Sequence, residues 1–228
     1  MIKFNRKFDP KTIRFLIFDL DGTLIDSRLD LVHSVNAMLR HLGLAELSGD
    51  VVASYVGDGA PMLVRRALGD PGDERFFKQG LDYFLSYYRE HKLDYTLEYP
   101  GIKHALSRIR DAKGLPRQMA VLSNKPVLPA RAILKALGLD SFFLSVYGGN
   151  SFSTKKPDPL GVKTLLEESG HPAEASIIVG DSFIDVVTGR NAGMWTCGVT
   201  YGFAPQSLSI APPDVLIDRP EELAELFE

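Results

Sequence analysis

Short apolar runs, each closed by polar or turn-forming residues, recur along the chain and constrain its fold more than any other feature. They occupy residues 13–18, 119–122, 142–147, 177–179, 195–199 and 215–217. Runs of this length predict β-strands that are buried on both faces. Stretches with apolar residues at helical spacing alternate with them, at residues 102–109, 130–137, between Pro159 and Gly170, and from Pro220 to the end. This alternation predicts an α/β fold with a doubly wound, mostly parallel sheet.

Residues 27–94 interrupt the alternation, because they contain no convincing strand. We expect helices there: one that Ser27 caps, one over residues 60–68 and one over residues 74–91. The last of these carries Phe77, Leu81, Phe84 and Tyr88 on one face. The sequence therefore predicts a catalytic core of residues 1–26 and 95–228 with a helical domain, residues 27–94, inserted after the first strand.

The charge balance and the cysteine count exclude several classes of protein. The chain of 228 residues carries 26 lysines and arginines against 29 aspartates and glutamates, a net charge of −3. We therefore expect no nucleic-acid partner and no membrane partner. A membrane span needs about 20 apolar residues, which no window approaches. The single Cys197 allows no intrachain disulfide and suits a reducing compartment. These features predict a cytoplasmic protein, either a monomer or a homodimer.

Two acidic residues, Asp19 and Asp21, directly follow the first predicted strand. Ligands of open α/β sheets bind beyond the carboxyl ends of the strands, so this position is a candidate site. Two carboxylates there can converge on one phosphate, with one attacking phosphorus while the other handles protons. Gly22 permits the sharp turn that this convergence needs. The alternative is an Asx turn with two solvated acids.

Three further polar clusters follow other predicted strands. Ser123 and Asn124 offer a hydroxyl and backbone N–H groups to phosphate oxygens, and Lys156 offers a point charge. Asp181 and Asp185 stand four residues apart at a strand-to-helix turn and suit a hard cation with oxygen ligands. Alone, each cluster could be a polar loop, a solvated basic pair or a helix cap. Together, and each behind a predicted strand, they indicate one site.

In this order the clusters resemble the motifs of the haloacid dehalogenase-like phosphatases. Phe18-Asp19-Leu20-Asp21-Gly22-Thr23-Leu24 is similar to the nucleophile motif of that superfamily. Ser123, Lys156 and Gly180-Asp181 with Asp185 are similar to its second, third and fourth motifs. The predicted helical unit resembles the family's α-helical cap. Within it, the segment from Tyr55 to Leu63 is similar to the cap loop of phosphoglycolate phosphatases.

This resemblance implies a Mg²⁺-dependent phosphatase with a Rossmann-like core that works through an aspartyl-phosphate. The implied catalytic residues are Asp19 as nucleophile, Asp21 as general acid and base, and Lys156. The implied metal site comprises Asp19, Asp21, Asp181 and Asp185. The implied contacts to a small phosphorylated substrate, with 2-phosphoglycolate expected, are Thr23, Ser123, Asn124, Gly57 and Gly59. The two glycines precede a predicted helix whose free N–H groups could hold a carboxylate, to which Arg65 could add charge.

Other functions stay open at this point. A phosphosugar mutase would use the same two acids, and a pyrophosphatase of the same superfamily is a second alternative. A dehalogenase would not need Asp21, because a halide leaves without a proton. A phosphonate hydrolase of this superfamily needs a cap lysine, and no lysine occurs from Gly22 through Phe77. A non-catalytic α/β binding protein would be expected to lack one of the proposed catalytic groups, Asp19, Asp21, Lys156 or Asp181, and none is missing.

Overall fold

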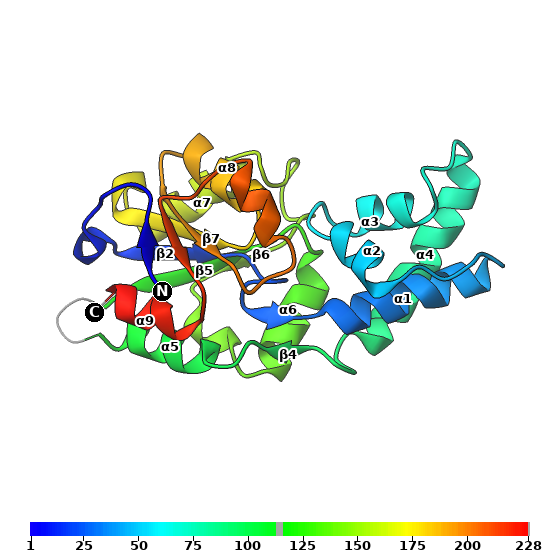
Figure 1. Cartoon of the computed structure of the whole chain (residues 1–228), viewed down its shortest axis with the longest axis horizontal. Coiled ribbons are helices and arrows are strands. Elements are labelled where there is room, and N and C mark those ends of the chain that lie inside the picture. Colours follow the sequence, from blue (N-terminus) through cyan, green and yellow to red (C-terminus); the bar gives the residue numbers. More distant parts are fainter. Residues whose placement is uncertain (113–115, 228) are drawn as a thin grey trace.

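A seven-stranded sheet runs through the computed structural model, which describes residues 1–112 and 116–227 (Figure 1). Its neighbouring strands pair in parallel, except that β1 pairs antiparallel with β9. In spatial order the strands are β1 (Lys3–Phe4), β9 (Val215–Ile217), β8 (Trp195–Val199), β7 (Ser176–Gly180), β2 (Phe15–Phe18), β5 (Gln118–Leu122) and β6 (Val146–Tyr147).

The central strands form where the apolar runs predict them. β2 lies between β5 and β7, with Phe15 opposite Gln118 and Ser176. Leu16 and Phe18 pack into one hydrophobic cluster, and Phe15 packs into another on the opposite face. Both faces of β2 are therefore buried, which is why its sequence is continuously apolar instead of alternating.

Helices cover the two faces of this sheet. On the face of Leu16 lie α5 (Ile102–Arg110), α6 (Val127–Ala136) and α9 (Glu221–Phe227). On the opposite face lie α7 (Leu160–Ser169) and α8 (Phe183–Asn191) (Figure 1). Short 3-10 helices occupy some connections: η1 (Pro10–Thr12), η2 (Asp140–Phe142), η3 (Ala173–Ala175) and η4 (Pro205–Ser209). The fold is the doubly wound α/β sheet that the alternation predicts.

A group of helices, called the helical insert below, lies between two short strands after β2 (Figure 1). Its helices pack around a hydrophobic cluster of their own that includes Val35, Leu63 and Phe84. The insert consists of α1 (Arg28–His41), α2 (Gly49–Ser54), α3 (Ala60–Ala67) and α4 (Glu74–His91). The two short strands, β3 (Ile25–Asp26) and β4 (Leu97–Glu98), pair antiparallel where the chain enters and leaves the insert.

Three local predictions are wrong, each for a physical reason. Phe142 ends η2 and Phe143 packs against the core without pairing, so only Val146 and Tyr147 of the predicted strand join the sheet. α2 was not expected, because it buries only Val52 and shows no apolar stripe. Ser27 precedes α1 but makes no side-chain cap, since its hydroxyl donates to Asp21 instead.

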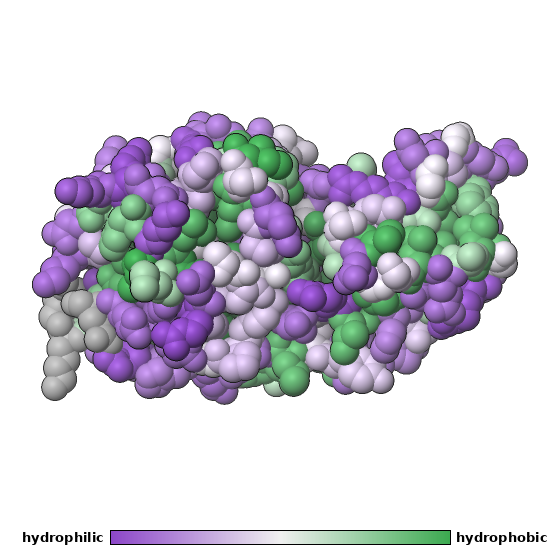
Figure 2. All heavy atoms as spheres, in the orientation of Figure 1, coloured by the Kyte–Doolittle hydropathy of each residue, from purple (hydrophilic) through white to green (hydrophobic). Residues whose placement is uncertain are grey.

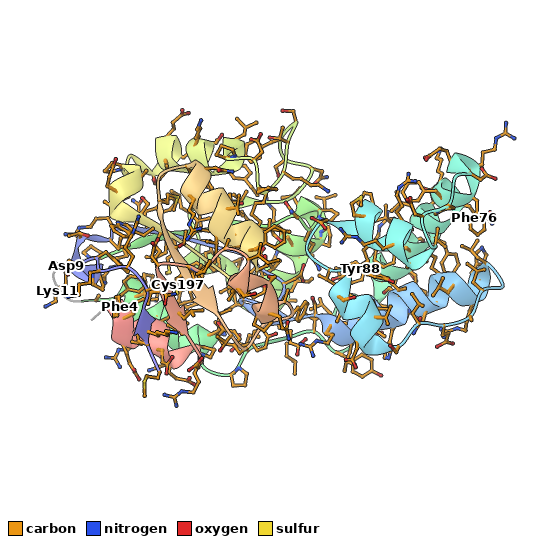
Figure 3. The ribbon with its side chains drawn as sticks, turned by 45° about the horizontal axis from the view of Figure 1, so that its top comes forward. Phe4, Asp9, Lys11, Phe76, Tyr88 and Cys197 are labelled. Carbon is orange, nitrogen blue, oxygen red and sulfur yellow. The ribbon has the colours of Figure 1, made fainter. Side chains whose placement is uncertain are left out.

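The face of the molecule drawn in Figure 2 mixes hydrophilic and hydrophobic side chains. On the face drawn in Figure 2, hydrophilic side chains are interspersed with smaller hydrophobic areas over both the sheet region and the helical insert. Within residues 1–112 and 116–227, no helix combines the length and the apolar character that crossing a membrane requires. Cys197 lies in the sheet region, where its free thiol is buried (Figure 3).

Candidate active site

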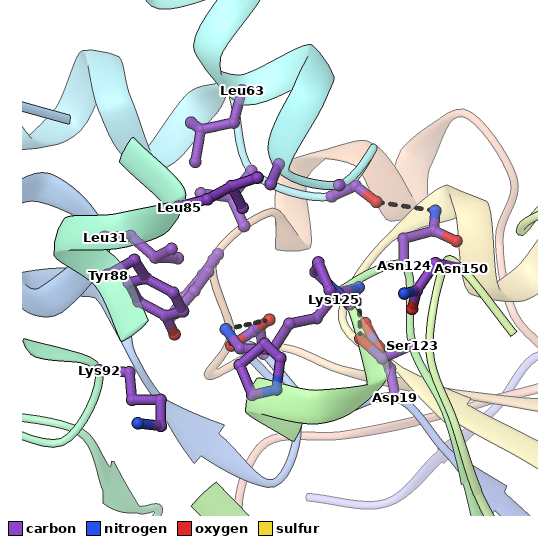
Figure 4. Close-up of a pocket in the computed structure, with 18 of the residues that line it drawn as sticks. Asp19, Leu31, Leu63, Leu85, Tyr88, Lys92, Ser123, Asn124, Lys125 and Asn150 are labelled. Atoms are coloured by element: carbon purple, nitrogen blue, oxygen red, sulfur yellow. Dashed lines mark hydrogen bonds and ion pairs between the residues drawn. The ribbon is translucent and has the colours of Figure 1, made fainter. Parts of the chain in front are cut away.

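A cavity of about 530 Å³ lies between the carboxyl ends of the sheet strands and the helical insert (Figure 4). Asp19, Ser123 and Asp181 line it from the loops that follow β2, β5 and β7. The insert contributes a mainly apolar wall that includes Leu31, Val56, Gly57, Gly59, Leu63, Phe84, Leu85 and Tyr88. A ligand in this cavity would therefore contact both parts of the chain.

Three carboxylates meet at the sheet edge of this cavity. Asp19, Asp181 and Asp185 each offer an oxygen atom, and these atoms all lie within 4.8 Å of one another. Burial raises the pKa of Asp181 to about 7, and the neighbouring carboxylates of Asp185 and Asp19 add to the shift. Burial also raises the pKa of Asp19 to about 6, although Lys156 opposes the change. Such a cluster of hard oxygen donors suits Mg²⁺.

The ammonium of Lys156 bridges two of these acids. Its Nζ lies 2.9 Å from Asp19 Oδ1 and 2.6 Å from Asp185 Oδ1. Burial alone would lower the pKa of Lys156, but Asp185 and Asp19 raise it above its ordinary value. The second oxygen of Asp185 accepts from the backbone N–H and the hydroxyl of Ser182, in the capping box that starts α8. Both oxygens of Asp185 are thus engaged, and they orient Lys156 toward Asp19.

Asp181 is held by the main chain. Its Oδ2 accepts from the N–H groups of Phe203 at 2.6 Å and Ala204 at 3.1 Å, which leaves Oδ1 for a ligand. Gly22 lies so close that a Cβ there would sit 2.3 Å from Asp181 Oδ2. The sequence analysis missed Phe203 and Ala204, because backbone donors leave no signal in the side-chain pattern.

The carboxylate of Asp21 lies against a second buried lysine. Lys125 Nζ donates to both oxygens of Asp21, at 2.9 and 3.0 Å, and the hydroxyl of Ser27 donates to Oδ1 at 2.5 Å. Burial alone would lower the pKa of Lys125, but Asp21 and Tyr88 together raise it above its ordinary value. The sequence places Lys125 in one polar cluster with Ser123 and Asn124 but predicts no role for it, since a lysine in a polar loop is common.

The predicted phosphate-binding loop is only partly free to bind a ligand. Ser123 lines the cavity, and its hydroxyl accepts from the backbone N–H of Lys125. The amide of Asn124 also lines it, but it donates to the carbonyls of Gly57, at 2.9 Å, and of Lys156, at 3.1 Å. Asn124 therefore joins the helical insert to the loop that carries Lys156.

Gly57 and Gly59 line the cavity at the start of α3. Gly59 has φ +85°, and a Cβ there would lie 2.8 Å from the carbonyl oxygen of Asn124, so glycine permits the close approach of the two loops. Arg65 does not line the cavity, because its guanidinium pairs with Asp70 and Glu74.

Thr23 lies outside the cavity lining, and so does Lys156. Thr23 is fully buried, and its carbonyl accepts from the hydroxyl of Tyr201. The hydroxyl of Thr23 has no hydrogen-bond partner among the described residues, and a contact of Thr23 with substrate stays a prediction. Lys156 instead reaches the site through its contact with Asp19.

A family model and several known proteins match most of this chain. Residues 16–199 match the model of the family described as haloacid dehalogenase-like hydrolase. A phosphoglycolate phosphatase of Neisseria meningitidis is 36% identical over 95% of this chain and 93% of its own, and one of Aquifex aeolicus is 35% identical over 95% and 97%. The crystal structure of a predicted phosphoglycolate phosphatase from Haemophilus somnus has a TM-score of 0.88 at 30% identity, covering 95% of this chain and 99% of its own.

The family match spans most of the sheet and the whole helical insert, and the four clusters of polar residues meet within it. The relatives align over nearly their full length, so the likeness is not confined to one motif. The chain therefore belongs to the haloacid dehalogenase-like hydrolases, and its relatives identify it as a phosphoric monoester hydrolase.

Proposed function

We propose that this enzyme hydrolyses a small phosphorylated acid, 2-phosphoglycolate, through an aspartyl-phosphate on Asp19 and with Mg²⁺ as cofactor. The observation that carries the proposal is the meeting of Asp19, Asp181 and Lys156 at a cavity that the helical insert closes over. The choice of substrate is supported by the relatives, which carry the name phosphoglycolate phosphatase.

The residues at the sheet edge fit Mg²⁺. Lys156 offsets part of the charge of Asp19 and Asp185, but these two carboxylates still contribute to the raised pKa of Asp181, and a cation among the three oxygens would relieve that repulsion. Asp19, the backbone carbonyl of Asp21 and Asp181 would hold the ion, with Asp185 orienting Lys156 beside it. Bound Mg²⁺ would neutralise charge on the phosphoryl oxygens and let an anionic nucleophile approach.

In the first step, a carboxylate oxygen of Asp19 attacks phosphorus, and the bond from phosphorus to the leaving oxygen breaks. Asp21 donates a proton to that oxygen, so that it departs as an alcohol. Lys156, held between Asp19 and Asp185, and the hydroxyl of Ser123 supply fixed positive charge and a donor where phosphoryl charge is redistributed.

In the second step, water attacks the phosphorus of the aspartyl-phosphate. Asp21 takes a proton from that water, and the bond from phosphorus to Asp19 breaks to give inorganic phosphate and the free carboxylate. The chemistry needs Asp21 to alternate between acid and base. Its contacts to Lys125 and Ser27 keep its carboxylate in one place through both steps.

The helical insert, residues 27–94, would serve as a cap domain on a core of residues 1–26 and 95–228. Its apolar wall excludes water from the phosphoryl group, which strengthens the electrostatic contacts at the sheet edge. Gly57 and Gly59 bring the start of α3 against Asn124, so the insert supplies backbone close to the leaving group.

A hydrolysis screen over phosphate esters, with and without Mg²⁺, tests the proposed substrate and cofactor. We expect 2-phosphoglycolate to exceed hexose phosphates and pyrophosphate in kcat/KM. Better hydrolysis of either of the latter would refute the substrate but not the phosphatase. A single turnover in ¹⁸O-water should label the carboxylate of Asp19, whereas label in phosphate alone would mean direct attack by water. Phosphate transfer to a sugar hydroxyl in place of water would favour a mutase.

A further inference from the structure

Lys125 occupies an unusual position in the cavity. Its side chain is 4% exposed, and it lies between Asp21 at the sheet edge and Tyr88 on α4 of the helical insert (Figure 4). Its Nζ donates two hydrogen bonds to Asp21, and the same Nζ lies 4.7 Å from the centroid of the Tyr88 ring. A buried ammonium with room for a further acceptor faces the cavity at this point.

Tyr88 adds a second unused donor beside it. The residue is 5% exposed and its ring stacks on Phe84, with the centroids 5.8 Å apart. Its hydroxyl is buried and makes no hydrogen bond of ordinary geometry within the described residues, although it lies near enough to the Lys125 ammonium for the two groups to shift each other's pKa. Leaving such a group without a partner is unfavourable, so a ligand atom that accepts a hydrogen bond there would be stabilised. Tyr88 lines the cavity, on the side of the insert that faces the sheet (Figures 3 and 4).

These two donors lie on the leaving-group side of the proposed reaction. Asp19 attacks phosphorus, whereas Asp21 hands its proton to the leaving oxygen, so the organic part of the substrate lies next to Asp21. Lys125 contacts Asp21, and Lys156 contacts Asp19. Lys156, behind Asp19, thus marks the phosphoryl end of the site, and Lys125, which lines the cavity beside Asp21, marks the leaving-group end.

We propose that the Lys125 ammonium and the Tyr88 hydroxyl together bind a carboxylate on the leaving group, and so make the enzyme selective for phosphorylated acids. Leu31, Phe84 and Leu85 make the wall around the two donors apolar. Two further cations, Arg89 and Lys92, also line the cavity, but Arg89 is exposed and Lys92 is half-buried, whereas Lys125 and Tyr88 are buried. A carboxylate can accept from an ammonium and a phenol at once, and in a site shielded from water such a contact discriminates strongly against a neutral analogue. This inference rests on the proposed function and assigns its specificity to two named side chains.

The test compares 2-phosphoglycolate with ethyl phosphate, which has two carbons but no carboxylate. The measured quantity is the ratio of kcat/KM for the two esters on the same protein, so that general damage to a variant cancels. Lys125→Met should lower the ratio roughly 10- to 100-fold and Tyr88→Phe about 3- to 10-fold, since each removes a donor to a charged group. Lys125→Arg, which keeps the charge, should retain part of the preference.

Two matched variants serve as controls. Lys135→Met makes the same change on an exposed part of α6, and Tyr83→Phe makes the same change on α4 where the ring stacks on His41. Both should keep the wild-type ratio. Lys92→Met and Arg89→Met test the rival cations, because both residues also line the cavity from the end of α4.

Each outcome decides the question. An equal loss for both esters in Lys125→Met would mean that Lys125 only positions Asp21 and would overturn the inference. A fall in the ratio for Lys92→Met or Arg89→Met but not for Lys125→Met would also overturn it. In both cases a wild-type preference for 2-phosphoglycolate leaves the proposed function intact. A wild-type enzyme that prefers ethyl phosphate would refute the proposed substrate and the inference together, while the absence of any hydrolysis would refute the phosphatase.

Discussion

Gly22→Ala should damage the site far more than an ordinary glycine substitution, because two separate constraints meet at this residue. Gly22 has φ +82°, in the left-handed region that side chains disfavour, and an added Cβ would lie 2.3 Å from Asp181 Oδ2. The carboxylate cannot simply turn away. Its Oδ2 accepts from the backbone N–H groups of Phe203 and Ala204, at 2.6 and 3.1 Å.

The size of the effect follows from these distances. Placing alanine at a left-handed position costs roughly 1–2 kcal/mol of unfolding free energy. Ordinary contact begins near 3.4 Å, so the carboxylate of Asp181 must move by about 1 Å, which weakens hydrogen bonds worth about 1.5–3 kcal/mol. Displacing a group of the site by about 1 Å can lower kcat/KM about 100-fold.

Gly43→Ala provides the matched control. Gly43 has φ +71°, and no atom lies within 4 Å of its added Cβ, so it meets the backbone strain without the clash. Denaturant unfolding and steady-state kinetics on both variants separate the two contributions. Gly43→Ala should lose only the backbone cost and keep wild-type kcat/KM. Equal activity in the two variants would refute the reasoning, because it would show that Asp181 tolerates the displacement.

Further predictions concern the lysine pair, the metal and the thiol. Lys156→Met should lower kcat about 100-fold or more, whereas Lys155→Met should cost little, because only Lys156 contacts Asp19; steady-state assays that gave the reverse order would contradict the assignment. Chelation should abolish turnover and Mg²⁺ restore it, and Asp181→Asn should raise the Mg²⁺ concentration for half activity; an unchanged requirement would exclude Asp181 as a ligand. Burial raises the pKa of the Cys197 thiol, so a thiol reagent at about pH 8, near the ordinary pKa of about 8.5, should react slowly with folded protein and fast with unfolded protein. Rapid reaction of the folded protein would show that the thiol is reached without unfolding.

The sequence predicts the sheet well because its central strands are buried on both faces. Such strands need continuous apolar runs. Polar residues follow these runs in the sequence, so the same pattern predicts both the strand and the loop that comes after it. The short pairings escape prediction. β3 and β4 have two residues each and pair with each other, although the whole helical insert separates them in the sequence. The run around Phe142 is an overprediction of strand. Phe142 and Phe143 are apolar because they pack against the core, and they do not pair in the sheet.

Side-chain partners within the site were harder to predict than the strands that carry them. Position after a strand predicts that Asn124 and Asp21 lie at one edge, but not which atoms they contact. The amide of Asn124 donates to backbone carbonyls of two neighbouring loops, and Asp21 accepts from Lys125, which is 104 residues away in the sequence. Contacts of this kind depend on the register in which β5 pairs with β2, and the sequence pattern does not predict that register.

Helical periodicity predicts that Tyr88 lies on a buried face, but it does not explain why a tyrosine stands there and not a phenylalanine. It falls on the apolar face of α4 with Phe84, and its ring does pack into the cluster of the insert. A position that only fills a core favours phenylalanine, because burying a phenol hydroxyl without a partner costs about 1–3 kcal/mol. The hydroxyl of Tyr88 makes no hydrogen bond of ordinary geometry in the described part of the chain, and Lys125 Nζ lies 4.7 Å from the centroid of its ring at the cavity. A tyrosine among core phenylalanines on a helix that faces a catalytic edge is therefore evidence of a ligand contact, and the unfavourable burial of its hydroxyl is relieved when that ligand binds.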